Sequence, residues 1–345
     1  MAETSPSIFL FGATGYLGGE FLIHLSRSFP THPVTALVRN LTPDRLSGLK
    51  RLHPEIQVVE GTLDDDSLIQ EQVQKHDIII NCASSDHWPS VKSTLDGLEK
   101  SSAARPGNPP IYIHVSGCGI VSDNVRGEPV EVLREWSDIG LDLKSCDPTN
   151  THLDSDIPIV EAGTRKENPI RTLILYPSQI YGIGEGVQRS TLWLRFFTTF
   201  AKQLGYVGTW GRGYNTMNNV HVKDVVSALG IILKAVLEGK ADEGAEGLYF
   251  CGSMQRKIAY REWTEVMGNH LHSKGLVKSP GTRPMPNEIV ESLGHYGWSL
   301  LGGNQAIIPE RLTTKFGWVP EESSKVSLLD TIPKAAEIAW LESVP

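Results

Sequence analysis

The stretch SIFLFGATGYLGG, residues 7–19, decides the fold that the sequence predicts. Its apolar run IFLF has the character of a buried strand, and the run FLIHL that follows is typical of a helix. Between them, Gly12, Gly15 and Gly18 would permit a tight turn, the close approach of a pyrophosphate and the packing of helix on strand. Strand, turn and helix together predict a dinucleotide-binding unit, with N–H groups at the helix N-terminus facing the phosphates.

Further short apolar runs continue the alternation of strands and helices. The intervals between the first four runs are long enough for crossover helices, and the runs are nearly all apolar, as in strands covered on both faces. The chain is therefore predicted to form an α/β fold of Rossmann type, a doubly wound parallel sheet of about seven strands. The runs are IFLF (8–11), VTALV (34–38), IQVVE (56–60), DIIINCA (77–83), IYIHVS (111–116), RTLILY (171–176) and LYFCG (248–252).

The rhythm of strands and helices changes after residue 180. A stretch rich in glycine and aromatic residues follows, then a helical pattern that ends at Gly239, then helices and loops punctuated by prolines. These features predict a smaller C-terminal substrate domain beside the dinucleotide-binding domain. We expect the Rossmann domain to comprise residues 1–180 and 218–252, and the substrate-binding domain to comprise residues 181–217 and 253–320.

The composition excludes several classes of protein. With 32 Lys and Arg against 40 Asp and Glu, the net charge of −8 provides no basic field for nucleic acid. The sequence shows no signal-peptide pattern and no run of 18 apolar residues, so we expect a soluble cytoplasmic protein without a membrane partner. The four cysteines are widely spaced and form no C-x-x-C, which predicts neither a disulfide framework nor a metal site.

Arg39 ends the second predicted strand, in VTALVRN. An acidic residue at this position would bind the ribose 2′-hydroxyl of NAD, whereas an arginine suits the 2′-phosphate of NADP through charge-assisted hydrogen bonds. The sequence therefore favours NADP(H) as the cofactor.

Six segments taken together, GATGYLGG, VVEGTLDD, DIIINCA, LILYPSQIYG, NNVHVKDVVSA and FGWVP, resemble the extended short-chain dehydrogenase/reductase superfamily, the NAD(P)-dependent epimerase/dehydratase group. They occur in the family's order along nearly the whole chain. In this family the element with Asn219, His221 and Asp224 usually links the two domains. The resemblance implies that the cofactor contacts are Gly12, Ala13, Thr14, Gly15, Tyr16, Leu17, Gly18, Arg39, Leu63, Cys82, Ala83, Ser84, Pro177 and Ile180.

The catalytic residues that the resemblance implies are missing. The family uses a tyrosine, a lysine four residues later and a Ser or Thr after the fifth strand. None of the nine tyrosines here is followed by lysine at that spacing, and the interval that should hold the catalytic tyrosine contains none. His152 and Asp156 fall near the tyrosine and lysine positions, and Gly117, preceded by Ser116, stands where the hydroxyl is expected. The active site is therefore predicted to be atypical.

His152, Ser116 and Tyr181 are the candidate catalytic residues. A histidine pKa of about 6.5 allows acid catalysis at neutral pH, and Asp156 would hold His152 charged if both lay on one helix face. However, Asp156 followed by Ile-Pro is typical of a helix N-cap, which predicts a very short helix ending at Gly163 and His152 in the preceding loop. The alternative roles are solvation for His152, turn capping for Ser116 and hinge packing for Tyr181.

The predicted substrate region is aromatic. The helical spacing of Trp193, Phe196, Phe197 and Phe200 indicates core rather than pocket. The loop after them contains only one basic residue, Arg212, so a small apolar or aromatic molecule fits better than a nucleotide sugar. The candidate substrate contacts are His87, Trp88, Tyr206, Trp210 and Tyr214.

These observations leave three hypotheses open. The leading one is an NADP(H)-dependent reductase of a small carbonyl, imine or activated alkene. The second is a redox-neutral isomerase or cyclase that keeps NADP(H) as structure, and the third is an NADP(H)-sensing regulator that resembles the NmrA-type proteins. We expect a monomer or homodimer, because Pro158 and Gly163 would interrupt a helix that the family uses to dimerise.

Overall fold

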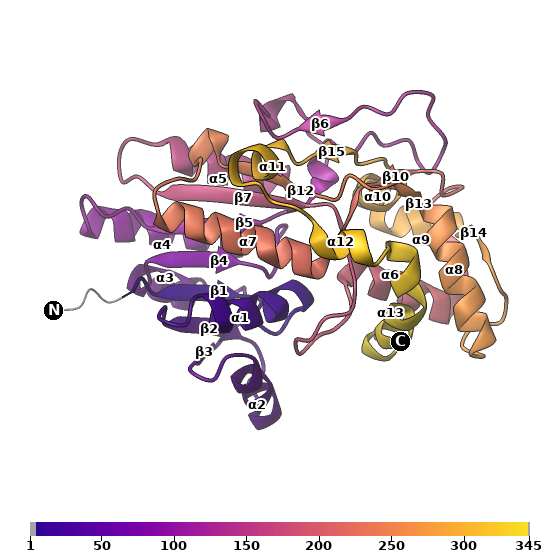
Figure 1. Ribbon diagram of the computed structural model, residues 1–345, viewed down its shortest axis with the longest axis horizontal. Coiled ribbons are helices and arrows are strands. Elements are labelled where there is room, and N and C mark those ends of the chain that lie inside the picture. The colour runs from indigo at the N-terminus through magenta and orange to yellow at the C-terminus, as the bar shows by residue number, and fades with distance from the viewer. Residues whose placement is uncertain (1–4, 344–345) are drawn as a thin grey trace.

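A computed structural model, which describes residues 5–343, has a seven-stranded sheet at its centre (Figure 1). The strand order is β12-β7-β5-β4-β1-β2-β3, and every neighbouring pair is parallel. This is a doubly wound Rossmann-type sheet, and all seven predicted strands are confirmed. The strands are β1 (Ile8–Phe11), β2 (Val34–Val38), β3 (Gln57–Glu60), β4 (Ile78–Asn81), β5 (Ile111–Val115), β7 (Arg171–Pro177) and β12 (Leu248–Cys251).

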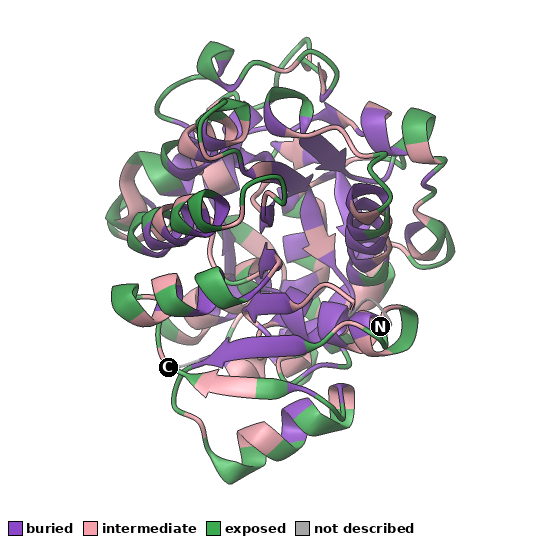
Figure 2. Cartoon of the chain, turned by 90° about the vertical axis from the view of Figure 1, so that its left-hand side faces the viewer, coloured by how far each residue is buried: buried purple, intermediate pink, exposed green. Residues whose placement is uncertain are grey.

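Helices cover both faces of the sheet, because alternate residues of each strand point to opposite sides. Ile8 and Leu10 of β1 lie in one core with α1, α2 and α7, whereas Phe9 and Phe11 lie in another with α3, α4 and α5. The strands other than the edge strand β3 are largely buried at the centre of the molecule, and the helices expose their outer faces (Figure 2). These helices are α1 (Tyr16–Ser28), α2 (Pro43–Leu52), α3 (Asp66–Lys75), α4 (Trp88–Ala104), α5 (Leu153–Thr164) and α7 (Val222–Leu237).

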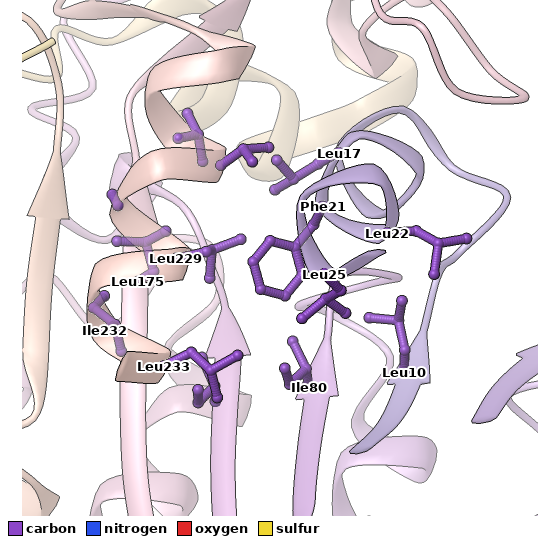
Figure 3. Close-up of a cluster of buried hydrophobic side chains, with 14 of the residues drawn as sticks. Leu10, Leu17, Phe21, Leu22, Leu25, Ile80, Leu175, Leu229, Ile232 and Leu233 are labelled. Carbon is purple, nitrogen blue, oxygen red and sulfur yellow. The ribbon is translucent and has the colours of Figure 1, made fainter. Parts of the chain in front are cut away.

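The packing of α1 on α7 fixes the helix that begins at the glycine loop. Phe21 and Leu25 of α1 face Leu229 and Leu233 of α7, above Ile80 of β4, and all five side chains are fully buried (Figure 3). Burying one such side chain stabilises the fold by roughly 1.5–3 kcal/mol. The N-terminus of α1 is therefore held rigidly at the carboxyl edge of the sheet.

A third core lies outside the sheet, in the part of the molecule that carries α6, α8 and α13. Phe197 and Trp263 pack edge to face there. The predicted core role holds for Phe197, which is buried, and in part for Trp193 and Phe200, whereas Phe196 is half-buried outside this core. The division into two domains remains a prediction, and this core would extend the second one to α13. The remaining helices are α6 (Leu192–Leu204), α8 (Tyr260–Ser273), α9 (Asn287–Val290), α10 (Gly294–Gly297), α11 (Glu310–Phe316), α12 (Glu321–Lys325) and α13 (Leu328–Glu342).

Short strands and hydrogen bonds join this region to the sheet. The amide of Ser323 in α12 donates to the buried Asp224 of α7 at 2.7 Å, consistent with the linking role expected for that segment. The chain between β5 and α5 also contacts the C-terminal part of the molecule, where the amide of Gly127 donates to the carbonyl of Gly302 at 2.6 Å. The short strands are β6 (Trp136–Ser137), β8 (Gln179–Tyr181), β9 (Val207–Thr209), β10 (Thr216–Met217), β11 (Asn219–His221), β13 (Ile258–Ala259), β14 (Thr282–Pro284) and β15 (Ile307–Ile308).

Two further expectations can be compared with the structure. No helix among residues 5–343 combines the length and apolar character needed to cross a bilayer. All four cysteines are free; Cys118, Cys146 and Cys251 are buried, whereas Cys82 is half-buried.

Candidate functional site

The glycine loop joins β1 to α1 as a turn that only glycine can make. Gly12 has φ of +85°, and a Cβ added to it would lie 2.6 Å from the carbonyl oxygen of Cys82 at the end of β4. A Cβ on Gly18 would lie 2.6 Å from the carbonyl carbon of Gly12, so this residue must also be small. Gly15 is the N-cap of α1 and makes no side-chain capping bond. The turn thus leaves the helix N-terminus available to an anion.

Two side chains near the start of α1 tie this turn to the loop after β8. The hydroxyl of Tyr16 donates to the carbonyl of Gly182 at 2.9 Å, and the Glu20 carboxylate accepts the amides of Gly186, at 3.1 Å, and Glu185. Burial raises the pKa of Glu20, although these amides oppose the shift. The sequence analysis missed Glu20, whose only signal is an acidic residue inside an otherwise apolar helix face.

The other predicted cofactor residues lie at the ends of successive strands. Arg39 follows β2 with an exposed side chain that has no ion-pair partner within the described chain. Leu63 follows β3, and Cys82, Ala83 and Ser84 follow β4. Ala13 and Leu17 are buried in the core beneath the turn, whereas Thr14 is half-buried. Pro177 ends β7 and Ile180 lies in β8, where it pairs with Val220 of β11.

His152 lies beside the carboxyl end of β5, at the N-cap of α5 with φ of +75°. Its ring Nδ1 is 2.6 Å from Oδ1 of Asp86 and 3.0 Å from the hydroxyl of Ser85. Its Nε2 lies over Gly117, where an added Cβ would approach it to 2.9 Å. The missing side chain at Gly117 therefore leaves the space that the imidazole occupies. The glycine in place of the family's hydroxyl residue and the histidine near the tyrosine position thus depend on each other.

Asp86 aligns this histidine. The hydroxyl of Tyr296 donates to its Oδ2 at 3.1 Å, while His152 contacts Oδ1. Burial alone would raise the pKa of Asp86, but the bonds from His152, Tyr296 and Ser85 outweigh burial and hold it below the usual value. Sequence reasoning missed Asp86 and Tyr296. Asp86 adjoins the singled-out His87 and could have been found as an acidic residue after β4, but nothing local marks Tyr296.

The prediction that Asp156 caps a short helix is wrong. Helix α5 begins at Leu153 with His152 as its N-cap, and Pro158 lies inside it. The buried Ile159 beyond the proline packs against the sheet, so tertiary packing outweighs the lost hydrogen bond. Asp156 is fully buried and accepts a hydrogen bond from Ser116 Oγ at 2.7 Å, so it does not pair with His152 as we considered.

Tyr181 lies away from the cluster formed by His152, Asp86 and Tyr296, which we call the His152 corner. Its side chain is buried, and its hydroxyl donates to the carbonyl of Val326 at 2.6 Å. Burial raises its pKa to about 12. This environment favours the hinge-packing alternative.

The candidate substrate contacts are dispersed. Trp210 is fully buried against Phe197 and Phe200, which favours a packing role. His87 caps α4 and its Nε2 lies 3.1 Å from Asp64 after β3, while the neighbouring Trp88 is exposed. Tyr206 contacts the guanidinium of Arg283, and Tyr214 contacts those of Arg212 and Arg261. The structure brings none of these five into the His152 corner.

A small pocket opens beside His152. Its lining includes Asp86, His295, Tyr296 and the turn that leads into α5. Within residues 5–343, no three His, Cys, Asp or Glu side chains are placed to hold a metal ion.

Comparisons with known proteins find similarities in sequence and in fold. Residues 4–94, which include the glycine loop and Arg39, match a family model described as the NmrA-like family. "Oxidase ucsJ" from Acremonium sp. is 25% identical to this chain over 354 residues, which cover 95% of this chain and 97% of that protein.

Solved structures share the fold at low sequence identity. DesIV, a dTDP-glucose 4,6-dehydratase from Streptomyces venezuelae with NAD and TYD bound, has a TM-score of 0.68 and 16% identity over 96% of each chain. A dTDP-glucose 4,6-dehydratase from Bacillus anthracis in complex with NAD has a TM-score of 0.65 and 16% identity, over 98% of this chain and 97% of that one. The resemblance to the extended short-chain dehydrogenase/reductase superfamily, the NAD(P)-dependent epimerase/dehydratase group, is thus confirmed at the level of the fold.

Proposed function

We propose that the protein is an NADP(H)-dependent reductase of a small, apolar or aromatic carbonyl, imine or activated alkene. The observation that carries this proposal is the juxtaposition of an intact dinucleotide turn with a replacement acid at the carboxyl edge of one sheet. The relative from Acremonium sp. is named an oxidase, and two fold neighbours hold NAD, which supports dinucleotide-dependent redox chemistry.

The residues present fit the cofactor. Gly12 and Gly18 leave a cradle that a Cβ would fill, and the uncapped N-terminus of α1 presents N–H groups to the pyrophosphate. The unpaired, exposed guanidinium of Arg39 would bind the 2′-phosphate. Pro177 and Ile180 would lie against the nicotinamide. When bound, NADPH supplies the hydride that adds to the electrophilic carbon of the substrate.

His152 supplies the proton in this proposal. Its Nδ1–H donates to Asp86, which stabilises the protonated ring and leaves Nε2 as the acid. As the substrate carbon gains the hydride, the Nε2–H bond breaks and the proton joins the substrate oxygen or nitrogen, or the second alkene carbon. Asp86 is therefore a positioning residue for His152, and Tyr296 positions Asp86.

Isothermal titration with NADPH, NADP and NADH tests the cofactor. Arg39→Ala should weaken NADPH binding about 10- to 100-fold, the usual range for a charge-assisted phosphate contact, and leave NADH binding unchanged. Arg165→Ala is the matched control, because Arg165 is an exposed arginine that pairs with Glu99 on α4. Binding of no dinucleotide would overturn the proposal, and a preference for NADH would overturn the choice of NADP(H).

The NmrA-like match favours one second candidate, an NADP(H) sensor. It covers only the N-terminal part of the chain, which holds the dinucleotide turn but not His152. NADPH oxidation in a screen of aromatic carbonyls and imines would support the reductase. Tight NADPH binding without turnover would favour the sensor, and conversion of a substrate without NADPH consumption would favour a redox-neutral enzyme.

A further inference from the structure

Asp156 is a buried carboxyl group to which the catalytic scheme above gives no role. It projects from α5 beneath the carboxyl end of β5 and is fully buried. Its Oδ2 lies 2.7 Å from Ser116 Oγ, and its Oδ1 has no hydrogen-bond partner in the described chain. A buried ionised carboxylate normally requires several donors or a cation. The single short hydrogen bond from Ser116 is a poor match for the charged form.

The histidine that faces Oδ1 does not provide that cation. His114 Nε2 lies 3.7 Å from Oδ1, beyond hydrogen-bonding distance. The amide nitrogen of Asn81, a donor only, lies 3.3 Å from His114 Nδ1, so the neutral ring carries its proton on Nε2. Burial, with a smaller contribution from His152, lowers the pKa of His114 to about 3, which keeps this ring neutral at physiological pH.

The other groups around Asp156 act in opposite directions on its pKa. His152 and the hydroxyls of Ser116 and Tyr176 favour its ionised form, whereas Asp86 disfavours it. Burial outweighs these contacts and raises the pKa of Asp156 to about 7. A neutral carboxyl group is therefore accessible just at and below neutral pH.

The state of Asp156 decides what Ser116 can donate. Ser116 is half-buried at the sheet edge, next to Gly117, over which the imidazole of His152 lies. When Asp156 is ionised, the single hydroxyl proton of Ser116 points inward to Oδ2. When Asp156 is protonated, the carboxyl becomes the donor, and the Ser116 proton is free to point outward.

We propose that Asp156 is a positioning residue whose protonated carboxyl donates to Ser116 Oγ, so that the Ser116 hydroxyl donates in turn to the reacting oxygen of the substrate. This inference rests on the proposed reductase function and adds a second group to its substrate site. Ser116 then holds the oxygen by a hydrogen bond while His152 transfers the proton. The carboxyl group transfers nothing, so it is unchanged after each turnover.

The pH dependence of kcat tests this proposal with Asp156→Asn. The amide of asparagine is isosteric with the carboxyl and donates to Ser116 at every pH. Wild-type kcat should fall above neutrality as Asp156 loses its proton. The Asp156→Asn variant cannot lose this proton, so its kcat should fall about tenfold less per pH unit over the same range. Ser116→Ala should lower kcat and should also lack this part of the decline.

Infrared spectroscopy separates this inference from the proposed function. The carbonyl stretch of a protonated carboxyl, followed in the unliganded protein, should lose one band as the pH rises through about 7, and Asp156→Asn should lack that band. Absence of the band in wild type at pH 6, or a decline of kcat in Asp156→Asn as steep as that of wild type, would overturn the role of Asp156. Failure of NADPH to bind would instead refute the reductase, with the infrared result unaffected.

Discussion

The dinucleotide turn and the His152 corner both depend on glycines that admit a neighbouring group, but the two regions differ in what that group is. At Gly12 the neighbour is backbone, the carbonyl of Cys82. At Gly117 the neighbour is the side chain of His152, which comes from a distant part of the sequence. A turn made of backbone appears in the sequence as a spacing of glycines, whereas a cluster of side chains from distant segments leaves no such local pattern.

The Gly12→Ala variant should have the largest effect and tests the backbone side of this comparison. An added Cβ meets Cys82 at φ of +85°, so we expect loss of measurable NADPH binding and a marked fall in the free energy of unfolding. Gly107→Ala is the control, because Gly107 has φ of +84° with no atom within 4 Å. It should cost only about 1–2 kcal/mol, the price of the left-handed backbone. Equal losses in both variants, measured by denaturant titration and calorimetry, would contradict the close-packed turn.

His152→Ala tests the side-chain region. Loss of a general acid should lower kcat about 10²- to 10⁴-fold, while the affinity for NADPH stays unchanged. His270→Ala is the matched control, because that histidine pairs with Glu337 between α8 and α13. Steady-state kinetics and titration with NADPH check both variants. If His152→Ala turned over at the wild-type rate, the imidazole would be a structural filler over Gly117.

Asp156→Asn tests the buried carboxyl below the His152 corner through the pH dependence of the free energy of unfolding. The folded-state pKa of Asp156 is raised from 3.8 to about 7, so the native protein holds a proton that the unfolded chain releases. Wild-type stability should therefore fall as the pH rises through this window, by up to about 4 kcal/mol relative to Asp156→Asn. Urea unfolding of both proteins at pH 4, 6 and 8 measures the difference. A difference independent of pH would show that the buried carboxyl does not titrate there.

Tyr296→Phe should have the smallest effect. Removing its hydrogen bond to Asp86 leaves the shorter contact between Asp86 and His152 in place, so we expect a loss of about 2- to 10-fold in kcat. The loss should vanish in an Asp86→Asn background, because Tyr296 acts through Asp86. An undiminished loss in the double variant would mean that Tyr296 acts on the substrate directly.

Most of the fold was predictable because its signals are local. The seven strands appear as apolar runs that match the observed sheet to within about two residues at each end, and the glycine loop lies where its spacing indicated. The misplaced start of α5 shows the limit. Asp-Ile-Pro is a good local signal for an N-cap, yet Leu153 and Ile159, on either side of it, are buried in one core and belong to one helix that begins at Leu153.

The site residues also divide into those with a local signal in the sequence and those placed by tertiary contacts. Ser116 and His152 were singled out because they occupy positions where a family pattern is broken. Asp86 and Tyr296 were missed, because Asp86 meets His152 across 66 residues of sequence and Tyr296 meets Asp86 across 210. Trp210, a candidate substrate contact on composition, is enclosed by Phe197 and Phe200 in the third core.

The sequence by itself determined the parallel sheet, the turn at Gly12 and the absence of the family's tyrosine and lysine, since each depends on residues close together in the chain. Only the tertiary structure decided that Gly117 makes room for His152, that Asp86 rather than Asp156 contacts the imidazole, and that Asp156 is buried beneath Ser116. Burial and charge at these positions come from packing segments distant in sequence, and that packing sets which group holds a proton.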